Sequence, residues 1–262
     1  MEEKNNPTPA PKPAPATAAT PAPAVPAAPA APAATTAPAK AAAHAPKAAP
    51  AAPATPPARQ IVFDSNEDRF SVAEQAIADP DVLNQLVENL STDMRRMRQF
   101  SAGALSVLSA SHPQLLVSYA SQLVDALYRP EAQTRWESLE VLARVAPLLP
   151  ELDETAIVGA EASLYDEDNG TARLSAVRFL AAYGGLGAKQ SLRVWPLLDE
   201  AIQCYHGDAE FQDMLIAVIG FASGDLDKEV KKALAERVRF DAQNGRGPLR
   251  RRTEQILALC SK

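Results

Sequence analysis

Few residues in this chain have the types and spacing that could do chemistry. Cys204, Tyr205 and His206 stand together, and a thiol beside an imidazole could act as a nucleophile with its base or as two metal ligands. Such a pair needs a third group to orient it, and none lies nearby in the sequence. Cys204 and Cys260 also lack the spacing of a redox or zinc site, so we interpret both as small buried thiols.

A glycine-rich segment resembles a phosphate-binding loop only briefly. No strand pattern precedes Gly184, Ala188 stands before Lys189, and Gln190 replaces the Ser or Thr that would coordinate magnesium. The chain contains neither a GxSxG nor an HExxH sequence. We therefore predict a non-catalytic protein with no cofactor and no metal site.

The strongest pattern is a charged residue that opens an apolar helical pattern at regular intervals. It occurs at Arg98, Arg135, Arg173, Asp213 and Arg251, and subtracting these numbers gives spacings of 37, 38, 40 and 38. A period of this length is typical of stacked helix pairs, because one pair cannot bury its own apolar face.

Apolar spacing and breakers place two helices in each repeat. In the second repeat, Pro113 suits a first helical turn, and Pro130 ends the apolar pattern that follows it. A second apolar stripe runs over residues 136–145 and ends at Pro147. Before the first repeat, Phe70, Ala73 and Ile77 suggest one further helix that caps the open end.

The segment Arg135–Leu142, RWESLEVL, resembles the second helix of a HEAT repeat, and the turns at 131–135 and 168–173 match the turn before it. The resemblance covers about residues 80–260. It implies an all-α fold: a right-handed α–α superhelix of about five HEAT-like hairpins whose second helices line a concave surface. The fourth repeat departs from the pattern, since Asp213 replaces the Arg, and the fifth turn carries Gly and Pro.

Composition divides the chain. We predict a disordered Ala/Pro-rich tail or linker over 1–59, a capping segment over 60–79, and the repeat domain over 80–262. Residues 60–262 carry 21 Lys+Arg (26 less five) and 30 Asp+Glu (32 less two), a net charge of −9, which disfavours general nucleic-acid binding. No apolar run is long enough to span a membrane, and we predict a cytoplasmic protein.

The candidate binding residues are mainly arginines. One alternative is that Arg98, Arg135, Arg173 and Arg251 grip an acidic partner; the other is that each pairs with an acidic residue of its own or the neighbouring turn. Three consecutive arginines begin the last helix, where the helix dipole disfavours cations, and we expect them to pair with acidic residues of preceding helices or to bind an anionic ligand. The full candidate set is Arg98, Arg135, Glu137, Glu140, Arg173, Arg178, Arg250, Arg251 and Arg252.

The resemblance favours a scaffold or adaptor that binds a protein or peptide partner on the concave face. Two alternatives remain open: a nucleic-acid-binding or DNA-repair-type protein, and a HEAT-like lyase or enzyme accessory subunit. Neither the partner nor the oligomeric state follows from the sequence.

Overall fold

The computed structural model of the protein describes residues 63–64, 67–149 and 151–261. The predicted tail, 1–59, lies outside these residues, as does part of the predicted capping segment. In the described ranges, regular structure is entirely helical: eleven α-helices joined by turns and three short 3₁₀ segments. The α-helices are α1 (Arg69–Ala78), α2 (Pro80–Glu88), α3 (Arg95–Ser111), α4 (Ala120–Ala126), α5 (Ala132–Val145), α6 (Glu154–Leu164), α7 (Gly170–Gly184), α8 (Ala188–Cys204), α9 (Phe211–Ala222), α10 (Lys228–Asn244) and α11 (Gly247–Cys260).

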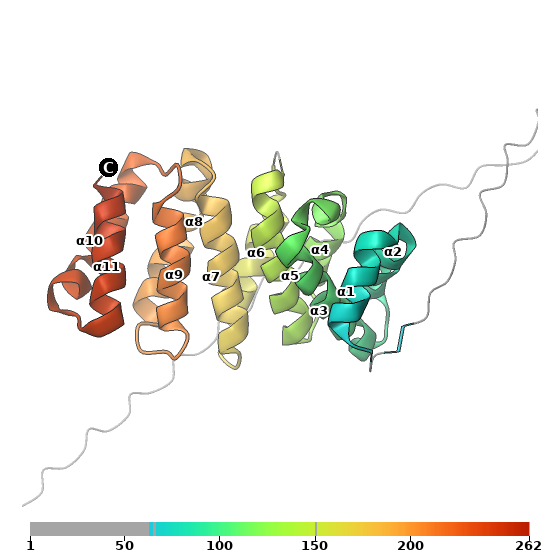
Figure 1. The fold of residues 1–262 in the computed structure, drawn as a ribbon. Coiled ribbons are helices and arrows are strands. Elements are labelled where there is room, and N and C mark those ends of the chain that lie inside the picture. Colours follow the sequence, from blue (N-terminus) through green and yellow to red (C-terminus); the bar gives the residue numbers. More distant parts are fainter. Residues whose placement is uncertain (1–62, 65–66, 150, 262) are drawn as a thin grey trace, which may run out of the picture. The chain divides into compact units, whose positions relative to one another are not determined.

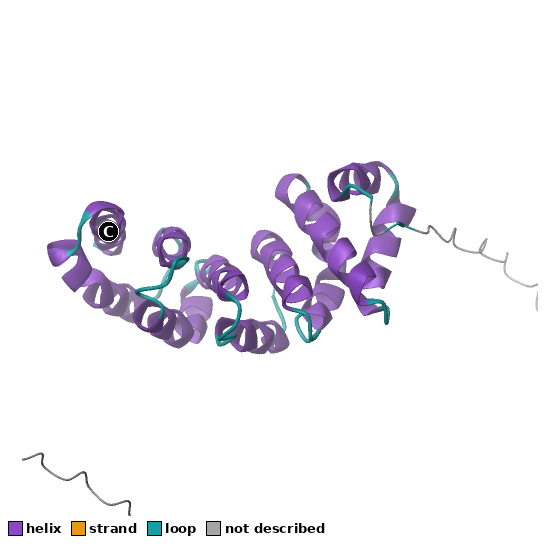
Figure 2. Ribbon diagram, turned by 90° about the horizontal axis from the view of Figure 1, so that it is seen from below, coloured by secondary structure: helices purple, strands orange, loops and turns teal. Residues whose placement is uncertain are grey.

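These helices form two rows. Each odd-numbered helix from α3 to α9 packs between the two nearest odd-numbered helices, and the even-numbered helices cover the other side (Figure 1). Both rows follow a curve, with the odd-numbered helices on its inner side (Figure 2). We call them the inner row and the outer row, and the exposed side of the inner row is the inner surface.

Five helix pairs are present, preceded by α1, which belongs to the inner row. The pairs are α2–α3, α4–α5, α6–α7, α8–α9 and α10–α11. Buried Leu, Val, Ala and Phe side chains form one continuous core between the two rows. Burial of apolar surface between neighbouring helices is thus the main stabilising term, as the periodic pattern predicts.

Side-chain caps set the starts of five of the described α-helices, α1, α2, α6, α7 and α10. Asp153 and Asp227 accept hydrogen bonds from the backbone N–H groups at the starts of α6 and α10, and Asn169 does so for α7. Gly247, with a φ of 56°, begins α11 in the left-handed region that favours glycine.

The second repeat differs from the prediction. The segment Pro113–Tyr119 forms a 3₁₀ helix, and the α-helix begins only at Ala120. Leu116 within this segment is fully buried, and the Tyr119 hydroxyl donates to Asn84 of α2. Because the segment contains no helix breaker after Pro113, we attribute the tighter winding to packing against the preceding repeat.

Ion pairs also join consecutive helices of the outer row. Arg193 of α8 donates to the Glu154 carboxylate of α6. Arg237 of α10 binds Asp199 of α8 through two hydrogen bonds, Nε–Oδ1 at 2.6 Å and Nη2–Oδ2 at 2.8 Å. Within the described ranges, no helix combines the length and apolar composition needed to cross a membrane.

Candidate functional site

The first arginine of the periodic series is buried in an ion pair. Arg98 is 8% exposed and Glu131, in the turn of the next repeat, is 5% exposed. Arg98 binds both carboxylate oxygens, with Nη2 at 3.0 Å from Oε2, and Nη1 donates to the Thr92 carbonyl at 2.7 Å. The guanidinium holds the pKa of Glu131 below its usual range.

Arg135 repeats this arrangement one unit later. Its Nη1 donates to the carbonyls of Arg129 and Pro130, at 3.1 and 2.8 Å, and its Nη2 donates to the Asp166 carboxylate. The side chain therefore fixes its own turn and connects it to the next one.

Arg173 does the same for the following turn. Its Nη1 donates to the carbonyls of Asp166 and Glu167, and its Nη2 lies 3.0 Å from Oδ2 of Asp208. The guanidinium carbon also lies 5.0 Å from the ring centroid of Tyr205.

The alternative in which arginines pair with neighbouring turns thus describes Arg98, Arg135 and Arg173. Partner contact by these three stays a prediction. The series ends with Arg173, because the exposed side chain of Arg251 forms no hydrogen bond or ion pair within the described part of the chain.

The other arginines at the start of α11 do not pair with acidic residues of preceding helices. Arg250 binds Glu254 on its own helix, with Nε–Oε1 at 2.8 Å. Arg252 donates instead to the side-chain amide oxygen of Gln212 on α9. That expectation is therefore wrong for both residues, because the nearest acceptors are a same-helix carboxylate and a neutral amide.

On the inner surface, Glu140 of α5 joins two helices. Its Oε1 accepts from Arg178 Nη1 at 2.8 Å and from Ser175 Oγ at 3.1 Å, both on α7. Its Oε2 accepts from Arg144 Nη2 at 3.3 Å. The Glu140 side chain is 15% exposed and that of Arg178 is 41% exposed, so the carboxylate lies beneath the guanidinium.

Glu137 forms a similar pair with the first inner-row helix. Its Oε1 lies 3.3 Å from Nη1 of Arg69 on α1, and the two side chains are 14% and 45% exposed. Arg69 also lines a small cleft of about 170 Å³ between α1, α3 and α5, with Arg96, Gln99, Phe100 and Gln133. The inner surface therefore presents half-exposed guanidinium groups above largely buried carboxylates.

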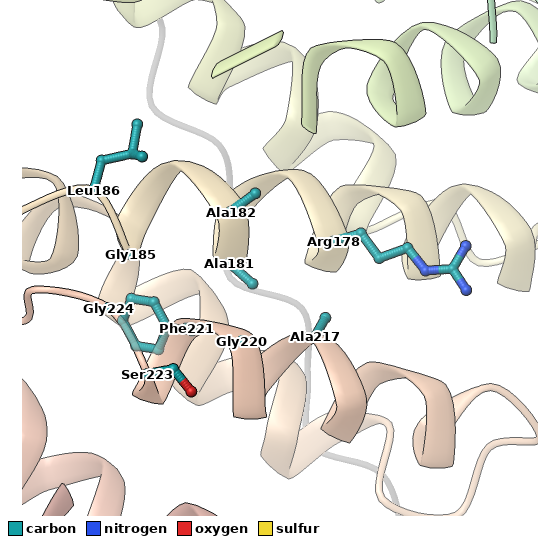
Figure 3. Close-up of a pocket in the computed structure, with 10 residues that line it drawn as sticks. All are labelled: Arg178, Ala181, Ala182, Gly185, Leu186, Ala217, Gly220, Phe221, Ser223 and Gly224. Atoms are coloured by element: carbon teal, nitrogen blue, oxygen red, sulfur yellow. The ribbon is translucent and has the colours of Figure 1, made fainter. Parts of the chain in front are cut away.

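A larger cleft lies between α7 and α9 (Figure 3). Its volume is about 380 Å³. No residue of α6, α8 or α10 lines it, so it opens on the inner surface. Arg178 stands at the opposite end from the turns that follow the two helices (Figure 3). The lining residues are Arg178, Ala181, Ala182, Gly185, Leu186, Ala217, Gly220, Phe221, Ser223 and Gly224.

The sequence did not reveal this cleft. Arg178 was a candidate, but the glycine-rich segment around Gly185 was considered only as a phosphate-binding loop and excluded. A glycine inside a helical pattern, Gly220, was the available signal, because glycine disfavours helix and often permits close approach to a backbone.

The cysteine and histidine residues form no catalytic arrangement among the described residues. Cys204 is exposed and Cys260 is half-buried, so the prediction of two buried thiols is wrong for Cys204. Nε2 of His206 lies 3.0 Å from Oδ2 of Asp241. The described ranges hold no group of three or more His, Cys, Asp and Glu side chains placed to bind a metal ion.

No protein-family model matches the chain, and no curated protein matches it in sequence. Among solved structures, it is similar to a designed armadillo repeat protein in complex with the peptide (KR)4, with a TM-score of 0.59, 16% identity, and coverage of 73% of this chain and 90% of that chain. It is also similar to a computationally designed armadillo repeat protein for modular peptide recognition, with a TM-score of 0.57, 15% identity, and coverage of 73% and 91%.

An archaeal HEAT-like repeats protein from Thermococcus onnurineus NA1 aligns with a TM-score of 0.45 and 12% identity, over 75% of this chain and 94% of that chain, a likeness too low to carry an argument. The two stronger likenesses and the two-row arrangement confirm the predicted fold class for the described residues. The helical part of this chain is a right-handed α–α superhelix with the armadillo/HEAT-like repeat fold.

Proposed function

We propose that the protein is a non-catalytic scaffold or adaptor that binds a protein partner on its inner surface. The carrying observation is that half-exposed arginines and the α7–α9 cleft of about 380 Å³ share this surface. The two designed armadillo proteins carry peptide recognition in their printed descriptions, and the shared fold supports a similar mode of binding here.

Three of the candidate residues belong to this surface: Glu137, Glu140 and Arg178. In the proposal, Arg178 contacts the partner, while Glu137 and Glu140 orient guanidinium groups from beneath. Arg98, Arg135 and Arg173 contribute by fixing the angle between repeats. Arg250, Arg251 and Arg252 extend the candidate surface at the last repeat, where Arg251 leaves its donors available.

The domain boundaries and location form part of the same proposal. Residues 1–59 act as a tether, residues 60–79 cap the array, and residues 80–262 bind. A net charge of −9 over residues 60–262 favours a protein partner over the phosphate backbone of a nucleic acid. Two free cysteines suit the reducing cytoplasm.

The test compares partner capture by the full chain and by matched surface variants. Ala182→Glu places a carboxylate in the cleft on α7, and Leu192→Glu places one at an exposed apolar position of α8 in the outer row. We expect quantitative mass spectrometry to show a reproducible partner that Ala182→Glu loses and Leu192→Glu retains. A further arm without residues 1–59 should keep the partner.

Equal loss in both Glu variants, or capture that depends only on residues 1–59, would place recognition elsewhere and refute the proposal. Circular dichroism of each variant shows whether the helices are intact.

A further inference from the structure

Gly220 is a helix glycine that its own fold does not require. A Cβ atom at Gly184 would collide with Val194 and Phe221, and one at Gly224 would collide with the backbone of Gly185. A Cβ atom at Gly220 meets nothing within 4 Å. Glycine in a helix interior is less stable than alanine, and its absent side chain lets another chain approach the backbone closely.

Gly220 lies in the cleft between α7 and α9, which is lined mainly by small, apolar side chains. Ala181 and Ala182 come from α7, Ala217 comes from α9, and the fully buried Phe221 ring also lines the cleft. The volume of about 380 Å³ is near the lower end of the range of about 300–1,000 Å³ for small-ligand pockets. The cleft therefore suits one or two aliphatic side chains.

Arg178 adds a charge requirement at one end of this cleft (Figure 3). Only its Nη1 is engaged in a hydrogen bond to Glu140, and the side chain is half-exposed. A guanidinium carries five N–H donors in a planar fork, so the remaining N–H groups of Arg178 can donate to a second carboxylate.

The charged residues at the two clefts of the inner surface also carry a net positive charge. Three arginines and two glutamates line the two clefts or form ion pairs with a residue that lines them, a net charge of +1. The whole of residues 60–262 carries −9. An acidic segment would be attracted to this surface and repelled by most others. The five residues are Arg69, Arg96, Arg178, Glu137 and Glu140.

We propose that the α7–α9 cleft binds an aliphatic side chain of an extended partner segment, and that Arg178 binds an Asp or Glu one or two residues away in that segment. This assignment rests on the proposed scaffold function and specifies its ligand. Gly220 is a specificity-determining residue, because any side chain there would fill the space that the aliphatic group occupies.

The chain's own tail does not fit this site. Residues 4–59 contain no Asp or Glu, and four lysines and one arginine make residues 1–59 net positive. The segment that fits is therefore an acidic one on another protein.

The test begins with a random peptide library displayed on phage and selected on the immobilised full chain. We expect the enriched peptides to share an acidic residue that lies one or two residues away from a Leu, Ile, Val or Met. One enriched peptide, labelled with fluorescein, then reports affinity by fluorescence anisotropy, and a labelled single-stranded oligonucleotide is measured in parallel.

Two variants and two matched controls assign the contacts. Gly220→Leu fills the cleft, whereas Gly207→Leu adds the same side chain in a turn where a Cβ atom also meets nothing within 4 Å. Arg178→Glu reverses the cleft charge, whereas Arg239→Glu reverses an exposed arginine of α10 in the outer row. We expect binding at least about tenfold weaker for the first member of each pair and little change for its control.

The outcomes separate the two levels of the proposal. If the library yields no enriched peptide, both the scaffold function and this site are overturned. If peptides bind but tolerate Gly220→Leu and Arg178→Glu, only the cleft assignment is overturned. Selection of basic peptides, or tighter binding of the oligonucleotide, also overturns it. Gly220→Ala replaces Gly220→Leu if the larger side chain prevents folding.

Discussion

Removing Glu131 should unfold the array far more easily than removing an exposed carboxylate. Glu131→Ala leaves the guanidinium of Arg98 buried, with only the Thr92 carbonyl retained as a partner. Breaking a buried ion pair by removing one member costs about 3–5 kcal/mol, because the remaining charge is uncompensated.

The matched control is Glu254→Ala in the last repeat. Glu254 pairs with Arg250 four residues away on the same helix, and both side chains are about half-exposed. Such pairs contribute about 0.3–0.5 kcal/mol, since water and salt screen them. The two substitutions should thus differ by several kcal/mol in the free energy of unfolding.

The assay is urea unfolding followed by circular dichroism and tryptophan fluorescence. Trp136 lies in the repeat that contains Glu131, and Trp195 lies two repeats later, so Trp136→Phe and Trp195→Phe backgrounds report on different parts of the array. Because repeat arrays can unfold in parts, the loss should be larger at Trp136. Equal midpoints for Glu131→Ala and Glu254→Ala would refute the assignment of Arg98 and Glu131 as a structural pair.

Three further predictions concern glycines, protons and thiols. Gly220→Ala should raise the free energy of unfolding by up to about 1 kcal/mol, because it removes a helix glycine without a collision. Gly224→Ala should lower it, because a Cβ atom there would collide with the nearby backbone. A lower melting temperature for Gly220→Ala, or a higher one for Gly224→Ala, would contradict the packing. The pKa of Glu131 is lowered from 4.5, so its stabilising effect is complete above that pH and is lost as the pH falls through the lower, folded-state value. The stability difference between the wild type and Glu131→Gln should therefore narrow in acid, and a constant difference would argue against this linkage. Burial raises the pKa of Cys260, so iodoacetamide should alkylate exposed Cys204 faster, as read by peptide mass spectrometry; equal rates would contradict the half-buried position.

The sequence predicted the repeat architecture because one apolar period governs most of the helical region. Breakers such as Pro130 and the turn at 244–248 also marked helix ends that the structure contains. The predicted capping helix does form, as α1, but its packing against α3 makes it a member of the inner row. Sequence periodicity shows which residues face a neighbour, whereas it does not show which row a single helix joins.

The site was less predictable, because its features arise between repeats. The partner of Arg98 lies 33 residues ahead and that of Arg135 lies 31 ahead. A carboxylate at such a distance cannot be chosen from the many acidic residues by spacing alone. The α7–α9 cleft exists because small residues of two helices face each other. The sequence does not show which residues of consecutive repeats lie opposite each other, so the space is visible only in the folded chain.

The ion pairs between repeats lie along both rows: Arg193–Glu154 and Arg237–Asp199 in the outer row, and Arg178–Glu140 in the inner row. Bending the array in either direction would stretch one of these sets, so together they oppose a change in its curvature. A preorganised receptor loses little conformational entropy on association. Differences in affinity among ligands would then depend mainly on how much conformational entropy each ligand loses on binding.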